Sequence, residues 1–235
     1  MQTMAITSEE AERSEDLYQE QLGAQRIRLD RMFAKLMLCQ WAFAIAIALI
    51  YSPYGWEGKQ KVVHAHVYLA LFMGAGLTLL PLIMVREMAG SVRTRQVIAV
   101  SQMLWSALLI HLTGGRIETH FHVFGSLAWL AFYLDWQILV SATVVVAADH
   151  LLRGLFYPES VYGILNPEWW RFLEHAGWVA FEDVILLIAC TNGLRSLREG
   201  AAREAQLETL SESEQNKAVA LELLLTEMKA RAPQA

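Results

Sequence analysis

Charged residues are scarce in the middle of this 235-residue chain. Only 18% of all residues are charged, against roughly 25% in soluble domains, and 55% are hydrophobic. The charges gather at the two ends: residues 1–30 hold seven acidic residues and three arginines, and residues 195–235 are again rich in charge. This distribution argues against a soluble globular domain and for a middle segment embedded in a membrane.

Other features are also missing. The only two cysteines, Cys39 and Cys190, lie inside apolar stretches, which excludes a disulfide framework and a cysteine-based zinc module. A net charge of −5 offers no basic surface for nucleic acid. The first thirty residues are too polar for a cleavable signal peptide. The sequence contains no glycine-rich nucleotide loop. It also contains no kinase, cyclase or chemotaxis output sequence after the last apolar stretch. We therefore expect no catalytic activity in this chain. Either it is an excised sensor region, which a stop directly after a coiled helix favours, or the output lies in a partner.

Six apolar stretches approach the length of about 20 residues that a helix needs to cross a bilayer. They cover residues 32–52, 62–84, 94–112, 120–134, 136–156 and 172–194. The fourth is short for a full crossing. It meets the fifth at Tyr133-Leu134-Asp135-Trp136, which predicts a tight turn capped by Asp135. The sequence thus predicts an all-α, polytopic membrane helical bundle of about six transmembrane helices.

Basic residues beside these stretches predict their orientation, because cytoplasmic loops carry an excess of Lys and Arg. With the N-terminus inside, ten basic residues fall on the cytoplasmic side and five on the outer side. Both termini are therefore expected in the cytoplasm. Trp56, Trp136, Trp169 and Trp170 fit the aromatic belts at the two membrane surfaces.

All seven histidines fall near the outer ends of the predicted spans. They are His64, His66, His111, His120, His122, His150 and His175. Carboxylates accompany several of them: Glu118 precedes the His120 and His122 pair, and Glu182 lies two helical turns below His175. A carboxylate at that depth is costly when it faces lipid, so Glu182 should face the bundle interior.

Imidazole and carboxylate together are ligands for copper, zinc or iron. The predicted metal ligands are His120, His122, His150 and His175, with Glu118, Glu182 and His66 next. Two residues of helix turn through about 200°, so His120 and His122 cannot both point inward from a regular helix. Either the helix starts between them, or one of them bonds a ligand's free nitrogen. Haem held by axial histidines is the alternative cofactor. A quinone pocket using His175 and Glu182 is a third.

Several nearby residues have simpler interpretations. His64 and His111 are expected to be hydrogen-bonded residues at the membrane edge. Asp149 and Arg153 are four residues apart and are expected to pair with each other rather than bind a metal. Glu174 and Asp183 could be ligands or structural groups.

Residues 195–235 predict a cytoplasmic helix that continues from the last span. Strong helix formers fill it, and Pro233 is its first proline. One heptad register contains Leu207, Leu210, Leu221, Leu224 and Met228, with Glu214 and Lys217 between them. Two apolar patches around a polar layer predict a weak parallel coiled coil in a homodimer. A solvated amphipathic helix is the alternative.

Three blocks of the sequence resemble known proteins. HLTGGRIETHFHVFGSLAWLAFY, VVAADHLLRGLFYPESVYG and RFLEHAGWVAFEDV are similar to the N-terminal multi-span regions of bacterial sensor histidine kinases and related signal transducers. The resemblance covers about residues 31–200 and implies a sensory module in the bacterial inner (cytoplasmic) membrane. It also implies a cytoplasmic output domain or a partner such as a kinase. It implies no ligand, so the metal set depends on residue placement alone.

These observations predict three parts: a cytoplasmic N-terminal helix at 1–30, a six-span sensor at 31–194 and a coiled-coil-like signalling helix at 195–235. The predicted function is a sensory domain, surrounded by membrane lipid, that binds a transition metal near the periplasmic face and relays its state through the last span. The alternatives are a haem- or quinone-binding redox sensor and a membrane di-metal oxidase.

Overall fold

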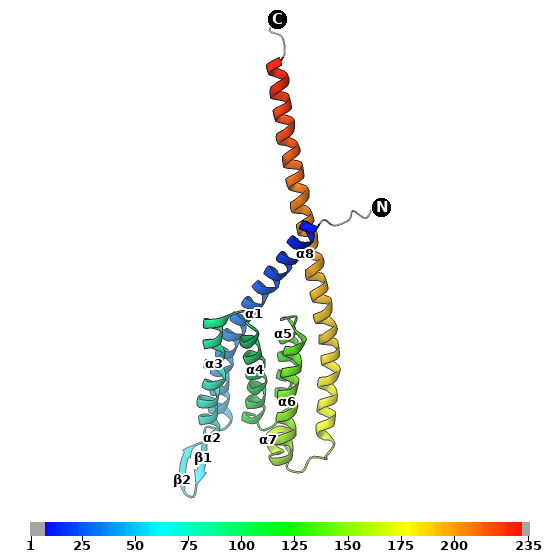
Figure 1. The fold of residues 1–235 in the computed structure, drawn as a ribbon. Helices are drawn as coiled ribbons and strands as arrows, with labels where there is room; N and C mark the ends of the chain where they lie inside the picture. Colours follow the sequence, from blue (N-terminus) through cyan, green and yellow to red (C-terminus); the bar gives the residue numbers. More distant parts are fainter. Residues whose placement is uncertain (1–7, 232–235) are drawn as a thin grey trace. The chain divides into compact units, whose positions relative to one another are not determined.

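The computed structural model describes residues 8–231 and is built almost entirely of helices (Figure 1). The chain forms two compact units. Unit 2 covers Gly23–Gly193, and unit 1 combines the residues up to Leu22 with those from Leu194 onward. The elements in order are α1 (Ser8–Tyr51), β1 (Tyr54–Glu57), β2 (Gln60–Val63), α2 (Ala65–Tyr68), the π-helix η1 (Leu69–Met73), α3 (Gly74–Met88), α4 (Val92–Leu112), α5 (Ile117–Ala131), α6 (Trp136–Phe156), α7 (Glu159–Tyr162) and α8 (Arg171–Arg231).

Three of these helices are long and apolar enough to cross a membrane: α1, the continuous stretch Ala65–Met88, and α6. Large apolar side chains on their surfaces are exposed, among them Phe43, Leu80 and Val144. Soluble proteins rarely display that much contiguous apolar surface, and a bilayer accounts for it. The prediction of a helical membrane protein is confirmed. By length and composition within residues 8–231, three spans are supported and the predicted number of about six is not.

The helix boundaries differ from the predicted ones in two places. No break separates the predicted N-terminal helix from the first span, because α1 is continuous through Asp30 and Arg31. Between α1 and α2 the chain forms a two-stranded antiparallel hairpin, in which Tyr54 pairs with Val63. The all-α prediction missed this hairpin because its strands are only four residues each, too short to show a period-two pattern.

Helix α4 lies at the centre of unit 2, where it packs against α3, α5 and α6 (Figure 1). Its large side chains Ile98, Met103, Trp105 and Ile110 are fully buried. Because neighbours cover α4 on all sides, it carries no single polar face. At one side of unit 2, the last turns of α4 and α6 lie beside the first turns of α5 and α8. We name this side of unit 2 the hairpin end, since β1 and β2 also lie there (Figure 1).

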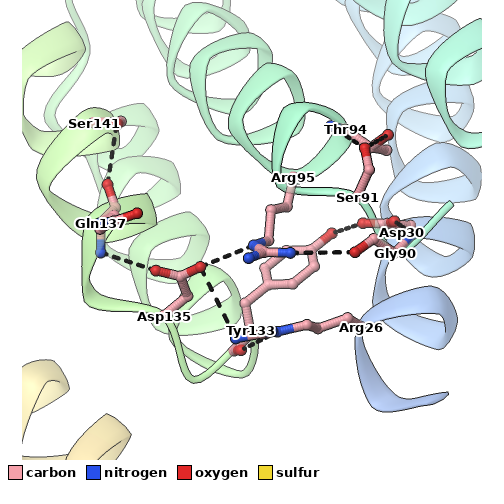
Figure 2. Close-up of polar contacts among 10 residues, drawn as sticks. All are labelled: Arg26, Asp30, Gly90, Ser91, Thr94, Arg95, Tyr133, Asp135, Gln137 and Ser141. Atoms are coloured by element: carbon pink, nitrogen blue, oxygen red, sulfur yellow. Dashed lines mark hydrogen bonds and ion pairs between the residues drawn. The ribbon is translucent and has the colours of Figure 1, made fainter. Parts of the chain in front are cut away.

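The opposite end of unit 2 is tied together by an ion-pair network of Arg26, Asp30, Arg95, Tyr133 and Asp135 (Figure 2). Arg95 Nε donates to Asp135 Oδ2 at 2.8 Å, and both side chains are nearly buried. The Tyr133 hydroxyl donates to Asp30 Oδ1 at 2.7 Å, and the backbone N–H of Gly90 donates to Asp30 Oδ2 at 2.6 Å. Buried charges persist only when they are paired in this way. The network therefore links α1, the α3–α4 turn and the α5–α6 turn.

The predicted tight turn between the fourth and fifth stretches is confirmed. Helix α5 ends at Ala131, and α6 begins at Trp136, with Asp135 as its N-cap accepting from the backbone N–H of Gln137. Leu134 in this turn has a φ of 52°, the left-handed conformation that branched residues seldom adopt.

Unit 1 is formed by the first turns of α1 and the long C-terminal part of α8. Arg13 and Glu208 form a two-fold hydrogen-bonded ion pair at 2.7 and 3.0 Å. The guanidinium of Arg198 lies 4.7 Å from the ring centroid of Tyr18. The N-terminal helix therefore packs on the stalk formed by the rest of α8. The register leucines Leu207, Leu210, Leu221 and Leu224, with Met228, are all exposed.

Candidate metal site

Three histidines from three helices meet at the hairpin end of unit 2. His120 lies on the first turn of α5, His150 on the last two turns of α6 and His175 on the first turns of α8. The ring centroids of His120 and His150 are 5.5 Å apart, those of His120 and His175 are 5.5 Å apart, and those of His150 and His175 are 5.9 Å apart. We call this group the imidazole trio.

All three rings of the imidazole trio are held in the same way. The Nδ1 atoms of His120, His150 and His175 each lie 3.0 Å from the carbonyl oxygen of the residue four positions earlier, Arg116, Val146 and Arg171 respectively. A carbonyl oxygen only accepts, so each Nδ1 carries the proton and each Nε2 keeps its lone pair. Metal-binding histidines typically donate their second ring nitrogen to a carbonyl or carboxylate in this manner. His120 Nε2 is buried and has no hydrogen-bond partner.

The spacing of the trio is close to that of a three-histidine metal site, but wider. A zinc ion lies about 2.0–2.1 Å from each ligating nitrogen, which for tetrahedral geometry places the ring centroids roughly 5 Å apart. The three observed separations, 5.5, 5.5 and 5.9 Å, are larger. Accordingly, no group of three or more His, Cys, Asp or Glu among residues 8–231 stands close enough to enclose an ion.

A cavity of about 60 Å³ opens between the three rings. Its walls are the trio together with Val123, Phe124, Thr143, Val146, Ala147, Phe172, Ala176 and Val179. No carboxylate lines it. A cavity needs roughly 10–15 Å³ of such volume to hold one water, so this cavity has room for an ion with a few small ligands.

A hydrogen-bonded frame supports His150 from the side. Arg153 Nε donates to Asp149 Oδ1 at 2.7 Å, so the predicted pairing of these two residues is confirmed. Asp149 Oδ2 also lies 3.4 Å from His150 Nδ1. Arg153 Nη1 donates to Ser160 Oγ at 2.8 Å, which ties α6 to the short helix α7. Tyr162, at the end of α7, places its ring centroid 5.3 Å from that of His175.

His66 belongs to a different histidine group. The ring centroids of His64 and His66 are 4.3 Å apart, and those of His66 and His111 are 4.9 Å apart. His66 Nδ1 lies 2.7 Å from Ser52 Oγ, and His111 Nδ1 lies 2.8 Å from Ser160 Oγ. The hydrogen bond expected for His111 is present. His66 is held by Ser52, which follows α1, and by His111 of α4, and neither belongs to the trio's helices.

His122 also points away from the imidazole trio, as the 200° turn from His120 requires. Its Nε2 lies 2.8 Å from Gln40 Nε2, and its Nδ1 lies 2.7 Å from Ser106 Oγ. The predicted bond from His122 to a nitrogen of another ligand is not present, because α1 and α4 supply its partners instead. His122 therefore sits in a separate polar site.

The two predicted carboxylate ligands lie outside the trio. Glu118 is exposed and bonded to the guanidinium of Arg116 at 3.2 and 3.3 Å, which lowers the pKa of the carboxyl group. Glu182 does not line the cavity, and its Oε2 is buried with no hydrogen-bond partner. Its neighbour Asp183 accepts a hydrogen bond from Thr143 Oγ1 at 2.7 Å, and Thr143 is a wall residue of the cavity.

Sequence reasoning missed several polar residues around the histidines. Ser160, Tyr162, Gln40 and Ser106 all contact an imidazole ring or nitrogen. Ser106 and His122 lie on different helices, so no spacing in the sequence relates them. The one available signal was polarity: Gln40 and Gln102 are uncharged amides inside apolar stretches, as are Gln96, Gln137 and Asn192.

Comparison with known proteins adds one similarity. The chain is 31% identical over 128 residues to the transducer protein Htr8 of Halobacterium salinarum. The chain resembles a signal transducer. The similarity covers 52% of this chain and only 19% of that protein, so the chain corresponds to about a fifth of its length. No family model matches the sequence, and no solved structure matches it.

Proposed function

We propose that this chain is the membrane sensory part of a signal-transduction receptor, and that the imidazole trio binds a transition metal ion such as copper, zinc or iron. The observation that carries the proposal is the shared state of His120, His150 and His175. All three rings are oriented by a carbonyl four residues earlier, all three keep a lone pair on Nε2, and all three residues line one cavity. The similarity to a transducer protein supports the signalling role.

A metal bound by the trio would have a free coordination position. Sites with three protein ligands keep the fourth position for water or an exchangeable ligand. Binding would also draw the rings together, because their present spacing exceeds that of a ligated set. His175 lies on α8, which runs on to Arg231. We infer that this inward pull on the first turns of α8 is the signal, and that the stalk carries it to a cytoplasmic output.

The rival cofactors fit less well. Haem iron takes one or two axial ligands from the protein, whereas three imidazoles meet at this cavity. A di-metal oxidase needs carboxylates that bridge its ions, whereas the cavity walls carry none and Glu118 is bonded to Arg116. A quinone held by His175 and Glu182 would require Glu182 at the cavity, which it does not line.

We further propose that the receptor is a homodimer in the bacterial inner membrane, with both chain ends in the cytoplasm. The exposed register leucines of α8 support a parallel coiled coil between two copies. In that arrangement the imidazole trio lies near the periplasmic face, and the output is a domain or a partner such as a kinase.

Cysteine cross-linking along the stalk tests the relay. A background with Cys39 and Cys190 replaced by alanine would receive single cysteines at Leu221, Leu224 and Met228, in lipid nanodiscs. We expect the rate of disulfide formation between copies to differ between zinc-loaded protein and protein freed of metal by a chelator. This difference should vanish in His175→Ala. Identical rates with and without metal, in protein shown to contain the metal, would contradict the relay while leaving the metal site intact.

A further inference from the structure

Exposed cations gather at the end of unit 2 that holds the ion-pair network, which we name the network end. Five of them form what we call the basic face: Arg28, Arg31 and Lys35 on α1, Arg86 on α3 and Arg93 on α4. Within residues 8–231, four of the five make no hydrogen bond or ion pair, and Arg86 Nε lies 3.7 Å from Glu87 Oε1. The carboxylates of Asp30 and Asp135 are bonded inside the network. The basic face therefore carries positive charge that the described part of unit 2 does not balance.

The cations at the hairpin end of unit 2 are mostly balanced by the protein itself. The pairs are Lys61 with the ring of Tyr54, Arg116 with Glu118, Arg153 with Asp149 and Arg171 with Glu168. Among the described residues of this end, Lys59 is the exception. The two ends of unit 2 thus differ in free charge, and an anionic partner is expected at the network end alone.

The exposed side of α1 changes from charged to apolar within one turn. Arg28, Arg31 and Lys35 are three and four residues apart, so they share one face of the helix. The same face continues with Leu38 and Leu49, which are 44% and 52% exposed. Helix α1 is one of the three helices long and apolar enough to cross a membrane. A span whose lipid-facing side becomes basic at one end places that end among the lipid headgroups, because long basic side chains reach toward the membrane surface.

Helix α3 shows the same change beside α1. Its exposed apolar residues Leu80 and Ile83 are followed one turn later by exposed Arg86. The Thr78 hydroxyl donates to the backbone carbonyl of Met37 at 3.3 Å, and the α3–α4 turn donates to α1 farther along, so the two helices run in opposite directions. The stretch Ala65–Met88 is also supported as a span. The cations of α1 and α3 therefore lie together at the same end of two neighbouring spans.

Unpaired guanidinium groups at this level match the phosphate of an anionic phospholipid. Arginine binds phosphate through two parallel N–H donors and is more weakly hydrated than lysine. The phosphate of phosphatidylglycerol has no cation in its own headgroup, whereas that of phosphatidylcholine is already balanced by a quaternary ammonium, which the basic face would repel. The acyl chains of a lipid bound here would lie on the exposed apolar residues of the same two helices.

We propose that unit 2 binds an anionic phospholipid at the network end, with its phosphate held by Arg28 and Arg31 of α1 together with Arg86 of α3. Asp30, which joins α1 to the ion-pair network, lies between the two arginines of α1 in the sequence. A lipid that bridges α1 and α3 therefore stabilises the packing of α1 on the α3–α4 turn. The anionic lipid content of that leaflet becomes an input to the chain that depends neither on the metal nor on the relay.

Competition between two lipids with identical acyl chains is the direct test. The full chain in neutral detergent would receive phosphatidylglycerol and phosphatidylcholine, and native mass spectrometry would count the lipids that remain bound. We expect phosphatidylglycerol to bind at least about tenfold more tightly and to raise the Tm. Equal binding of the two lipids would overturn the proposal. Metal-loaded and metal-free protein should behave alike, which separates this outcome from that of the metal site.

Inorganic phosphate, added to the same samples, distinguishes a lipid site from a site for the free anion. We expect it to leave phosphatidylglycerol bound, because the apolar faces of α1 and α3 contribute to binding only when acyl chains are present. Displacement of the lipid by inorganic phosphate at a comparable concentration would contradict the lipid assignment.

Two double variants with the same loss of charge locate the site. Arg28→Gln with Arg31→Gln removes two cations from the basic face, and Lys59→Gln with Lys61→Gln removes two from the hairpin end. All four side chains are exposed, so both variants should fold, as helical circular dichroism would verify. We expect the first to lower phosphatidylglycerol affinity by about tenfold or more and the second to leave it unchanged. Equal losses would mean that net charge alone attracts the lipid, and full affinity in the first variant would place the lipid elsewhere; either result refutes the proposal.

Discussion

His120 and His150 face each other from α5 and α6 with their ring centroids 5.5 Å apart, and each donates its Nδ1–H to a backbone carbonyl of its own helix. Two imidazoles fixed in this manner keep an unprotonated Nε2, and His175 adds a third ring to the same cavity. The Nε2 of His120 is buried without a hydrogen-bond partner, and burying such a lone pair without a donor is unfavourable. A cation at the cavity resolves it, and this is the physical basis of the proposed metal site.

Single histidine substitutions should lower metal affinity when they fall in the imidazole trio and leave it unchanged when they fall among the other four histidines. His150→Ala and His175→Ala each remove one ligand, and we expect metal affinity to fall beyond the 10–100-fold loss that follows removal of an outer partner. His64→Gln is the matched control, since His64 contacts His66 and lies outside the trio. Competition with a coloured chelator measures all three affinities. Equal losses in His64→Gln and His150→Ala would contradict the assignment.

Metal binding should weaken in acid. Protons compete with the metal for Nε2 of His120, His150 and His175, so binding is strongest at high pH and weakens in acid. Titration of metal release between pH 8 and pH 4 measures this. Release should involve more than one proton per metal ion. Affinity that stays constant across this range would show that carboxylates or other groups hold the metal instead.

Breaking the ion-pair network should destabilise unit 2. Arg95→Leu leaves the buried carboxylate of Asp135 without its closest cation, and removal of one partner of a buried pair typically costs about 3–5 kcal/mol. Arg86→Leu is the control, because its side chain is 87% exposed and its ion pair with Glu87 spans 3.7 Å. Thermal unfolding in detergent should show a large drop in Tm for the first variant and almost none for the second. Similar Tm values for both would mean that the network contributes little.

Two neighbouring glycines distinguish backbone strain from crowding. Gly114 and Gly115 both have positive φ, at 69° and 75°, where other residues cost roughly 1–2 kcal/mol. A Cβ at Gly114 meets open space, whereas one at Gly115 would collide with the backbone of Val161, Tyr162 and Gly163. We expect Gly115→Ala to lower the Tm clearly more than Gly114→Ala. It should also loosen α7 and with it the contact of His111 with Ser160, which hydrogen exchange of α7 would report.

The proposed coiled coil predicts a dependence on register. Arginine at Leu221 and Leu224 places charge in the seam between two stalks, and we expect the double variant to be monomeric in light scattering. Arginine at Leu223, which is 64% exposed but outside the register, should leave the dimer unchanged. If both variants remain dimeric, the stalk does not form the interface.

Some of this organisation could be predicted because it depends on local sequence. Asp135 caps α6 and Asp149 pairs with Arg153 because each acts within one turn of its own helix. The meeting of His120, His150 and His175 was also predictable, since all three stand at helix ends that short connections bring to one side. Because His120 and His122 are two residues apart on α5, their side chains point about 200° away from each other, and His122 lies outside the imidazole trio.

Other features depend on tertiary contacts that no periodicity reveals. The charge of Asp30 suggested that a helix ends before the first apolar stretch. Helix α1 continues through Asp30 instead, because the Tyr133 hydroxyl and the Gly90 N–H donate to its carboxylate. His66 contacts His111 of α4, and His111 is in turn bonded to Ser160 of α7. The partners of His122 come from α1 and α4, at sequence separations of 82 and 16 residues.

Elemental analysis of the purified chain, together with its visible absorption spectrum, tests the central claim most directly. The account predicts one copper, zinc or iron ion per chain, retained through dialysis at pH 7.5 and lost in His150→Ala and His175→Ala. A Soret band would assign haem to the site instead, and protein exposed to these metals that retains none would show that the three imidazoles serve only to hold the helices together.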